Sequence, residues 1–271
     1  MKRSKKRMNA KELGLIIIIV FLNLIGCGEK KVASTWFEGN INIDGSREDW
    51  GNIFIYLEDE KIAVGLYNSV SDLYICLVSN DREIIVQFLR QGFTIWFDPK
   101  GGKKETMGIK YPLAVRPAGI SNRENRGQSV RGMNDIETQV NQLKVSQHSM
   151  DIMGPNEEMV DRIFRHSTYG VELELGFFDG NFVYELKIPL EPSTTSPYAV
   201  NTSLGETIGI GFKTNKIDLD NIRNQMRRGG RGSGGRRGGM RGGGMRGGGS
   251  GGPQMPKPIE FWLQVTLADK E

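Results

Sequence analysis

The chain has 271 residues and only two cysteines, so it is long enough for one large domain with a substantial core, and a fold stapled by several disulfides is excluded. Its net charge of +4 comes from two segments: six basic residues precede residue 12, and seven arginines lie between Arg227 and Arg246. The rest of the chain is acidic, which excludes a uniformly basic domain of the kind that binds nucleic acid.

The first predicted element is an apolar run from Leu13 to Ile25 that follows the basic residues. Its length suits the apolar region of a secretion signal and is below the ~20 residues of a membrane-spanning helix. Together with Leu24-Ile25-Gly26-Cys27, the segment resembles a bacterial lipoprotein signal. The resemblance implies removal of the signal peptide 1–26 and a diacylglycerol, with fatty acyl groups such as palmitate, on Cys27. An uncleaved N-terminal anchor is the alternative.

Either anchor places the following chain outside the cytoplasm, attached to a membrane of the cell envelope. Gly28 follows the cysteine, and by resemblance to enterobacterial sorting this favours the outer membrane or its periplasmic face. Residues 27–38 are polar and charged at first, which predicts a tether between the lipid and a folded domain.

Residues 39–267 are predicted to form a single β-domain. Apolar, β-branched and aromatic residues alternate in eight segments, namely Ile62–Tyr67, Leu73–Val78, Ile84–Leu89, Gly92–Phe97, Val171–Phe177, Phe182–Ile188, Ile208–Thr214 and Ile259–Leu267. Asp179-Gly180 predicts a tight hairpin, and Cys76 is expected to be a buried thiol. Asn134–Val145 is a weak helix candidate. Strands without interleaved helices predict an all-β fold, an antiparallel β-sandwich of the jelly-roll or immunoglobulin-like type.

Two segments interrupt the predicted strands. Residues 116–147 are polar and predict a long surface excursion. Residues 227–258 form a Gly/Arg-rich segment before the last strand, and 15 of the 24 residues from Gly229 to Gly252 are glycine, so we expect a disordered loop. The loop resembles the RGG segments of RNA-binding proteins but lacks their aromatic residues. We therefore expect no nucleic-acid binding, and instead contact with anionic lipid, polysaccharide or a protein partner, or no specific contact.

Four motifs, in this order along the chain, resemble those of family 9 carbohydrate-binding modules. They are Ile41–Trp50 with its Asp44-Gly45 turn, Gly92–Gly102, Tyr184–Leu190 and Ile208–Phe212. The resemblance spans about residues 40–267 and implies a β-sandwich that binds sugars without catalysis. It also allows haem binding, because some relatives of this sandwich carry haem.

Strand alternation places a tryptophan on the polar face of each of two strands. Trp96 shares its face with Asp98, and Trp262 shares its face with Glu260 and Gln264. An indole stacks on the C–H face of a sugar ring while carboxylates and amides bond the hydroxyl groups, so these five residues are the predicted ligand-binding residues. The alternative is that Trp96 and Trp262 only cover the sheet.

The sequence predicts no enzyme, since its acids, such as Glu172 and Glu174, alternate as solvent-facing residues do. No cofactor is expected, although an acidic sandwich allows calcium, and His148 with Met150 or Met153 could ligate haem. The predicted function is a membrane-anchored exported lipoprotein that binds a glycan or a cell-envelope component. A haem-binding electron carrier and a scaffold that uses the Gly/Arg-rich loop are the alternatives.

Overall fold

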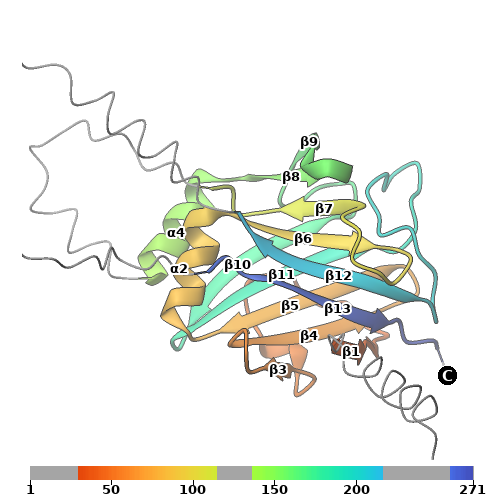
Figure 1. Cartoon of the computed structure of the whole chain (residues 1–271), viewed down its shortest axis with the longest axis horizontal. Helices are drawn as coiled ribbons and strands as arrows, with labels where there is room; N and C mark the ends of the chain where they lie inside the picture. Colours follow the sequence, from red (N-terminus) through yellow and green to blue (C-terminus); the bar gives the residue numbers. More distant parts are fainter. Residues whose placement is uncertain (1–29, 115–135, 216–256, 271) are drawn as a thin grey trace, which may run out of the picture.

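The computed structural model of the chain describes residues 30–114, 136–215 and 257–270. The predicted signal peptide, Cys27 and most of the predicted Gly/Arg-rich loop lie outside these residues. The described residues form two facing β-sheets with two helices at one end (Figure 1). The prediction of an antiparallel β-sandwich is confirmed.

The first sheet has seven strands. In spatial order they are β1 (Lys30–Ala33), β13 (Glu260–Thr266), β12 (Thr207–Thr214), β6 (Phe93–Asp98), β7 (Met107–Lys110), β8 (Ser149–Met153) and β9 (Met159–Phe164). The second sheet has six strands. They are β10 (Glu172–Phe178), β11 (Asn181–Pro189), β5 (Asp72–Ser79), β4 (Ile62–Asn68) and β2 (Thr35–Trp36), while β3 (Ile55–Leu57) also pairs with β4. Strand pairing is antiparallel except between β1 and β13 and between β2 and β4.

The core lies between the sheets and follows the alternation seen in the sequence. Phe93, Ile95 and Phe97 of β6 point inward and are fully buried. Phe93 meets Tyr184 of β11 edge to face, with ring centroids 5.3 Å apart. Aromatic pairs of this geometry add to the free energy gained from apolar burial, so β6 and β11 fix the centre of the sandwich.

One predicted strand is wrong. Residues Ile84–Leu89 belong to helix α2 (Arg82–Gln91). The carboxylate of Asp81 accepts hydrogen bonds from the backbone N–H groups of Glu83 and Ile84, at 2.9 and 3.1 Å, which is the geometry of a helix N-cap. The apolar residues of this segment recur at helical spacing, so Ile85, Phe88 and Leu89 share one side of the helix and are buried.

The predicted polar excursion ends in a second helix. Helix α4 (Ile136–Ser146) coincides with the weak candidate Asn134–Val145 and lies beside α2 at the same end of the sandwich (Figure 1). Its buried residues Ile136, Val140 and Leu143 recur at intervals of four and three.

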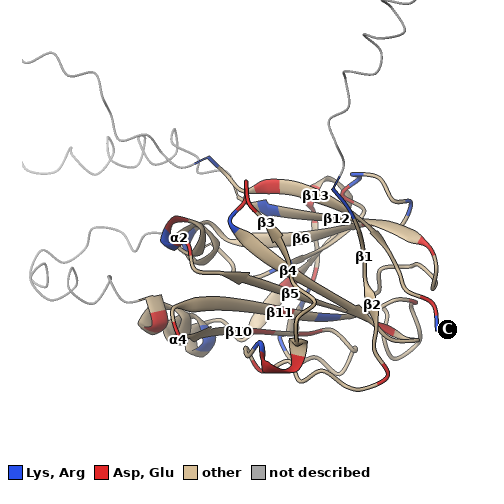
Figure 2. Cartoon of the chain, turned by 90° about the horizontal axis from the view of Figure 1, so that it is seen from below, with Lys and Arg blue, Asp and Glu red and all other residues tan. Residues whose placement is uncertain are grey.

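Part of the predicted tether is folded. Lys30 to Ala33 pair with β13 in the first sheet, and Thr35 and Trp36 pair with β4 in the second. These strands lie on the side of the molecule that Figure 2 presents. Strands at an edge often carry charged and exposed residues, which explains why this segment reads as a tether.

The chain crosses between the sheets at Ser34, and Asn68 holds the crossing in place. The buried Asn68 side chain accepts hydrogen bonds from Ser34 Oγ (2.5 Å) and the Ala268 N–H (3.0 Å) and donates one to the Ala268 carbonyl (2.9 Å). This network joins the first strands to the end of β13.

The motif around Asp44-Gly45 folds over the outer face of the second sheet. The buried carboxylate of Glu185 on β11 accepts hydrogen bonds from the N–H groups of Asp44 (3.0 Å), Gly45 (2.6 Å) and the Trp50 indole (2.6 Å). Trp50 is fully buried here, and so is Cys76, as the sequence predicts. The motifs Ile41–Trp50 and Tyr184–Leu190, which are far apart in the sequence, therefore contact each other in the fold.

The stability of this contact is expected to depend on pH. Burial raises the pKa of Glu185 to about 7 from an ordinary 4.5, although the hydrogen bonds from Trp50 and Gly45 act in the opposite direction. Because the folded state favours the protonated acid, the stabilisation is fully present below pH ~4.5 and is lost as pH rises through about 7. Between pH 5 and 8 the free energy of unfolding in urea should fall by up to ~3 kcal/mol more in the wild type than in Glu185→Gln.

The matched control is Glu48→Gln, which alters an exposed glutamate of the same motif. It should keep the pH dependence of the wild type. Identical pH dependence in Glu185→Gln and the wild type would contradict the role given to Glu185.

Candidate functional site

The outer face of the seven-stranded sheet carries all five predicted ligand-binding residues. Trp96 and Asp98 lie on β6, and Glu260, Trp262 and Gln264 lie on β13, with β12 between them. Gly211 of β12 is directly opposite both Trp96 and Trp262. The structure therefore assembles these residues on one face, but it gives them different roles.

Trp262 lies flat on the sheet. A Cβ atom placed on Gly211 would come within 2.6 Å of ring atoms Cε2 and Cζ2, so the ring packs directly on the glycine backbone. The side chain is half-buried, and Glu260 on the same face is exposed and has no hydrogen-bond or ion-pair partner among the described residues. We refer to Trp262, Gly211 and Glu260 as the Trp262 platform.

Trp96 packs on a glycine in the same manner but is closed off. A Cβ atom on Gly108 would lie 2.8 Å from its ring, and the side chain is only 2% exposed. On the same face the ammonium of Lys213 pairs with Glu105 (3.0 Å) and Glu157 (2.7 Å), which come from two different loops. In this arrangement Trp96 offers no ring face to a ligand and covers the sheet.

Asp98 and Gln264 both hold the loop between β6 and β7. The buried Asp98 carboxylate accepts hydrogen bonds from the N–H groups of Lys100 (3.1 Å) and Lys104 (2.9 Å). Gln264 Nε2 donates to the Gly101 carbonyl at 2.8 Å. Their polar groups are used within the protein, so Trp262 and Glu260 are the members of the predicted set that the described part of the chain leaves accessible.

A pocket of 330 Å³ lies at the C-terminal ends of β2 and β13. It is lined by Trp36, Glu38, Ala268, Asp269 and Lys270. Lys270 pairs with Glu38 at 3.1 Å, and the ammonium lowers the pKa of that carboxyl group. The indole N–H of Trp36 lies close enough to lower the pKa of Glu38 slightly further. This N–H is buried, and its geometry does not make a hydrogen bond with any described acceptor.

Sequence reasoning missed this pocket because Trp36 fell within the predicted tether. The β-prone run Ala33 to Phe37 is the signal that could have found it.

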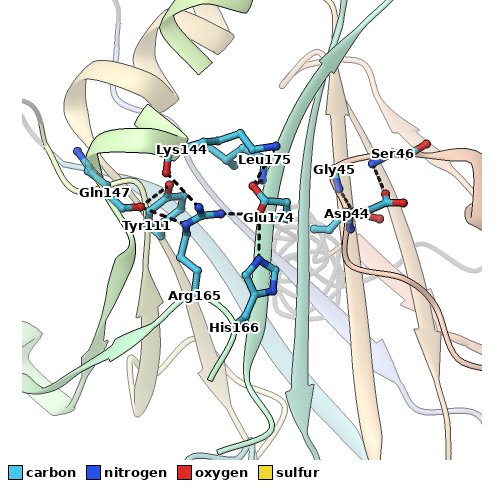
Figure 3. Close-up of polar contacts among 11 residues, drawn as sticks. Asp44, Gly45, Ser46, Tyr111, Lys144, Gln147, Arg165, His166, Glu174 and Leu175 are labelled. Atoms are coloured by element: carbon cyan, nitrogen blue, oxygen red, sulfur yellow. Dashed lines mark hydrogen bonds and ion pairs between the residues drawn. The ribbon is translucent and has the colours of Figure 1, made fainter. Parts of the chain in front are cut away.

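An ionic cluster around the buried carboxylate of Glu174 connects α4 to β10 and to the segment between β9 and β10 (Figure 3). Around the carboxylate of Glu174 lie Arg165 Nη1 (2.6 Å), His166 Nε2 (3.0 Å) and Lys144 Nζ (3.3 Å). Burial alone would raise the pKa of Glu174, but the hydrogen bonds from His166 and Arg165 hold it below its usual value. The prediction that Glu174 faces solvent is wrong, because its charge is neutralised inside the fold.

The guanidinium of Arg165 also binds the end of helix α4. It donates to the carbonyl groups of Lys144 (3.2 Å) and Gln147 (3.1 Å), and it lies over the ring of Tyr111. A cation at the C-terminal end of a helix is favourable, so the cluster has a structural role.

Loss of Arg165 should therefore release α4. Arg165→Met leaves the buried Glu174 charge short of its main partner, and we expect the free energy of unfolding to fall by ~3 kcal/mol. Urea unfolding at pH 7 measures this loss, and amide hydrogen exchange should show faster exchange within α4. Lys61→Met breaks the ion pair between Lys61 and Asp81, at 2.6 Å. Because Lys61 is half exposed and water screens the pair, this variant should lose much less stability than Arg165→Met. Equal losses in the two variants would argue against a structural cluster.

The haem ligands considered from the sequence occupy different environments. His148 is exposed, Met150 is fully buried in the core between the sheets, and Met153 lies buried on the outer face. Within residues 30–114, 136–215 and 257–270, no group of three or more His, Cys, Asp or Glu side chains is arranged to hold a metal ion. In the same residues, none of the helices has the length and apolar character needed to span a membrane.

No protein-family model and no curated protein matches the sequence. Among solved structures, the chain is similar to a family 9 carbohydrate-binding module from Caldicellulosiruptor kristjanssonii in complex with glucose. The identity is 13% and the TM-score 0.32, over 70% of this chain and 81% of that one. The same module in complex with cellotriose gives 13% identity and a TM-score of 0.31, over 70% and 79% of the two chains.

Proposed function

We propose that the protein is an exported lipoprotein, held to a membrane by lipid on Cys27, whose β-sandwich binds a glycan of the cell envelope without catalysing a reaction on it. The observation that carries the glycan proposal is the Trp262 platform, a half-buried indole that lies flat on the sheet beside a carboxylate without a partner among the described residues.

The geometry of the platform suits a sugar ring. Gly211 has no side chain, so one face of the indole rests on the backbone and the other can face outward. Packing on the sheet fixes the ring before a ligand arrives, which reduces the entropy lost on binding. An indole face stacks on the C–H groups of a sugar, and the Glu260 carboxylate can accept hydrogen bonds from its hydroxyl groups.

The anchoring part of the proposal is supported by the sequence that ends in Leu24-Ile25-Gly26-Cys27. An apolar run of this length favours a processed signal over a spanning helix. The haem alternative is weaker, because His148 is exposed and Met150 is buried in the core, so the two side chains do not line one accessible site for a haem.

Removal of the indole at position 262 should abolish glycan binding. We expect Trp262→Ala to weaken the affinity for the best oligosaccharide of a panel at least tenfold, about 1.4 kcal/mol, because the stacking surface is lost. The full lipidated chain can be titrated by calorimetry in a detergent without a sugar headgroup. The matched controls are Trp96→Phe, which changes the buried tryptophan, and Trp36→Ala, which changes the pocket.

The three variants separate the two surfaces. Loss of binding in Trp36→Ala with retention in Trp262→Ala would assign the glycan to the pocket and contradict the platform. No binding of any glycan by the folded wild type would contradict the glycan proposal. A copurifying protein that is lost on deletion of residues 229–252 would then favour the scaffold alternative.

A further inference from the structure

We propose that the edge of the sandwich formed by β1 and β3 rests on the membrane surface, so that the domain stands edge-on to the bilayer. We call this edge, Lys30–Ala33 with Ile55–Leu57, the anchor edge. The inference rests on the lipid proposed for Cys27 and adds the orientation in which that lipid holds the domain.

The first argument is the reach of the chain. Only Gly28 and Glu29 separate Cys27 from Lys30, which is already paired with Leu263 in the first sheet. Three Cα-to-Cα steps span at most about 11 Å when fully extended. The polar headgroup layer on each side of a bilayer is itself roughly 6 Å thick, so Lys30 cannot move far from the membrane surface.

The second argument is the contact between Lys30 of β1 and the turn that follows β3. Lys30 Nζ bonds Glu60 Oε1 at 2.9 Å and lies 3.9 Å from Asp59 Oδ2, and both acids belong to the turn that joins β3 to β4. β1 ends the first sheet and β3 pairs along the outer edge of β4, so the two strands border one side of the sandwich, seen from outside in Figure 2. A lipid near Lys30 therefore brings this whole side to the membrane.

The third argument is the chemistry of the exposed side chains. Tyr56 is 60% exposed and Ile55 is 39% exposed, and Lys31 on β1 is exposed as well. Tyrosine favours the headgroup region of a bilayer, aliphatic groups favour the layer beneath it, and lysine attracts phosphate. Lys30, which pairs with Glu60 and lies near Asp59, offsets part of the negative charge of the turn Glu58–Glu60, and Lys31 adds a second positive charge to this edge.

A second group of exposed apolar residues cannot contact the membrane together with the anchor edge. Met159, Val160 and Phe164 lie on β9, which ends the seven-stranded sheet on the side opposite β1. A tether that begins at β1 cannot bring both edges to one flat surface, so β9 faces away from the membrane.

A weak contact is sufficient for this orientation. Tethering makes the contact between the edge and the bilayer intramolecular, with an effective concentration in the millimolar range for a short link. The Trp262 platform lies on β13, next to β1, and it faces sideways along the membrane. The glycans within its reach are then those close to the bilayer surface.

The test uses a nitroxide probe on the full lipidated chain in vesicles of phosphatidylethanolamine and phosphatidylglycerol. Cys27 is blocked by its lipid, and Cys76 is fully buried with its pKa raised by burial, so an introduced cysteine is the reactive one. Tyr56→Cys places the probe on the anchor edge. Phe178→Cys places it on the last residue of β10, next to the turn that leads to β11, at a side chain that is 77% exposed.

The expected result is a severalfold higher ratio of oxygen to nickel-complex collisions at position 56 than at position 178, because oxygen concentrates in the bilayer. A flexible Gly/Ser linker of about twelve residues inserted after Gly28 should reduce the difference. Equal ratios at the two positions, with the diacylglycerol mass found on Cys27, would overturn this inference alone. Absence of that mass would overturn both the proposed anchor and the orientation that depends on it.

Discussion

The crossing of the chain at Ser34, held by Asn68, is the constraint on which the other features depend. Its hydrogen bonds tie the first strand of each sheet to Ala268, just after the last strand. Buried polar groups are costly unless all their hydrogen bonds are made, so this small network specifies one arrangement of three chain segments. It places β1 beside β13, positions Trp36 in its pocket, and fixes the edge that carries the N-terminal residues.

Glycine decides what the outer face of the first sheet can do. Gly211 and Gly108 let two indoles lie flat on the backbone, where a larger residue would force them upright. The two sites differ in how far the indole is exposed. Trp96 is only 2% exposed, whereas Trp262 stays half-buried beside Glu260, whose carboxylate has no partner among the described residues.

Much of the fold could be predicted because the central strands are long and alternate cleanly, as β6 and β13 do. The error at Ile84–Leu89 arose because a short apolar run fits both a strand and a helix, and the Asp81 cap decided between them. The edge strands β1 and β2 were missed because they are short and partly charged. Alternation placed Trp96 and Trp262 on the same face, but the difference in their burial is a tertiary property that alternation does not encode.

The central claim is that a sugar ring stacks on Trp262. The most direct measurement is the two-dimensional nitrogen-proton spectrum of the indole N–H groups of the four tryptophans, recorded as the best oligosaccharide is added. The account predicts a saturable shift of the Trp262 signal and an unchanged Trp50 signal, since Trp50 is buried against Glu185 on the other sheet. A saturable shift of another indole, with Trp262 unchanged, would contradict it.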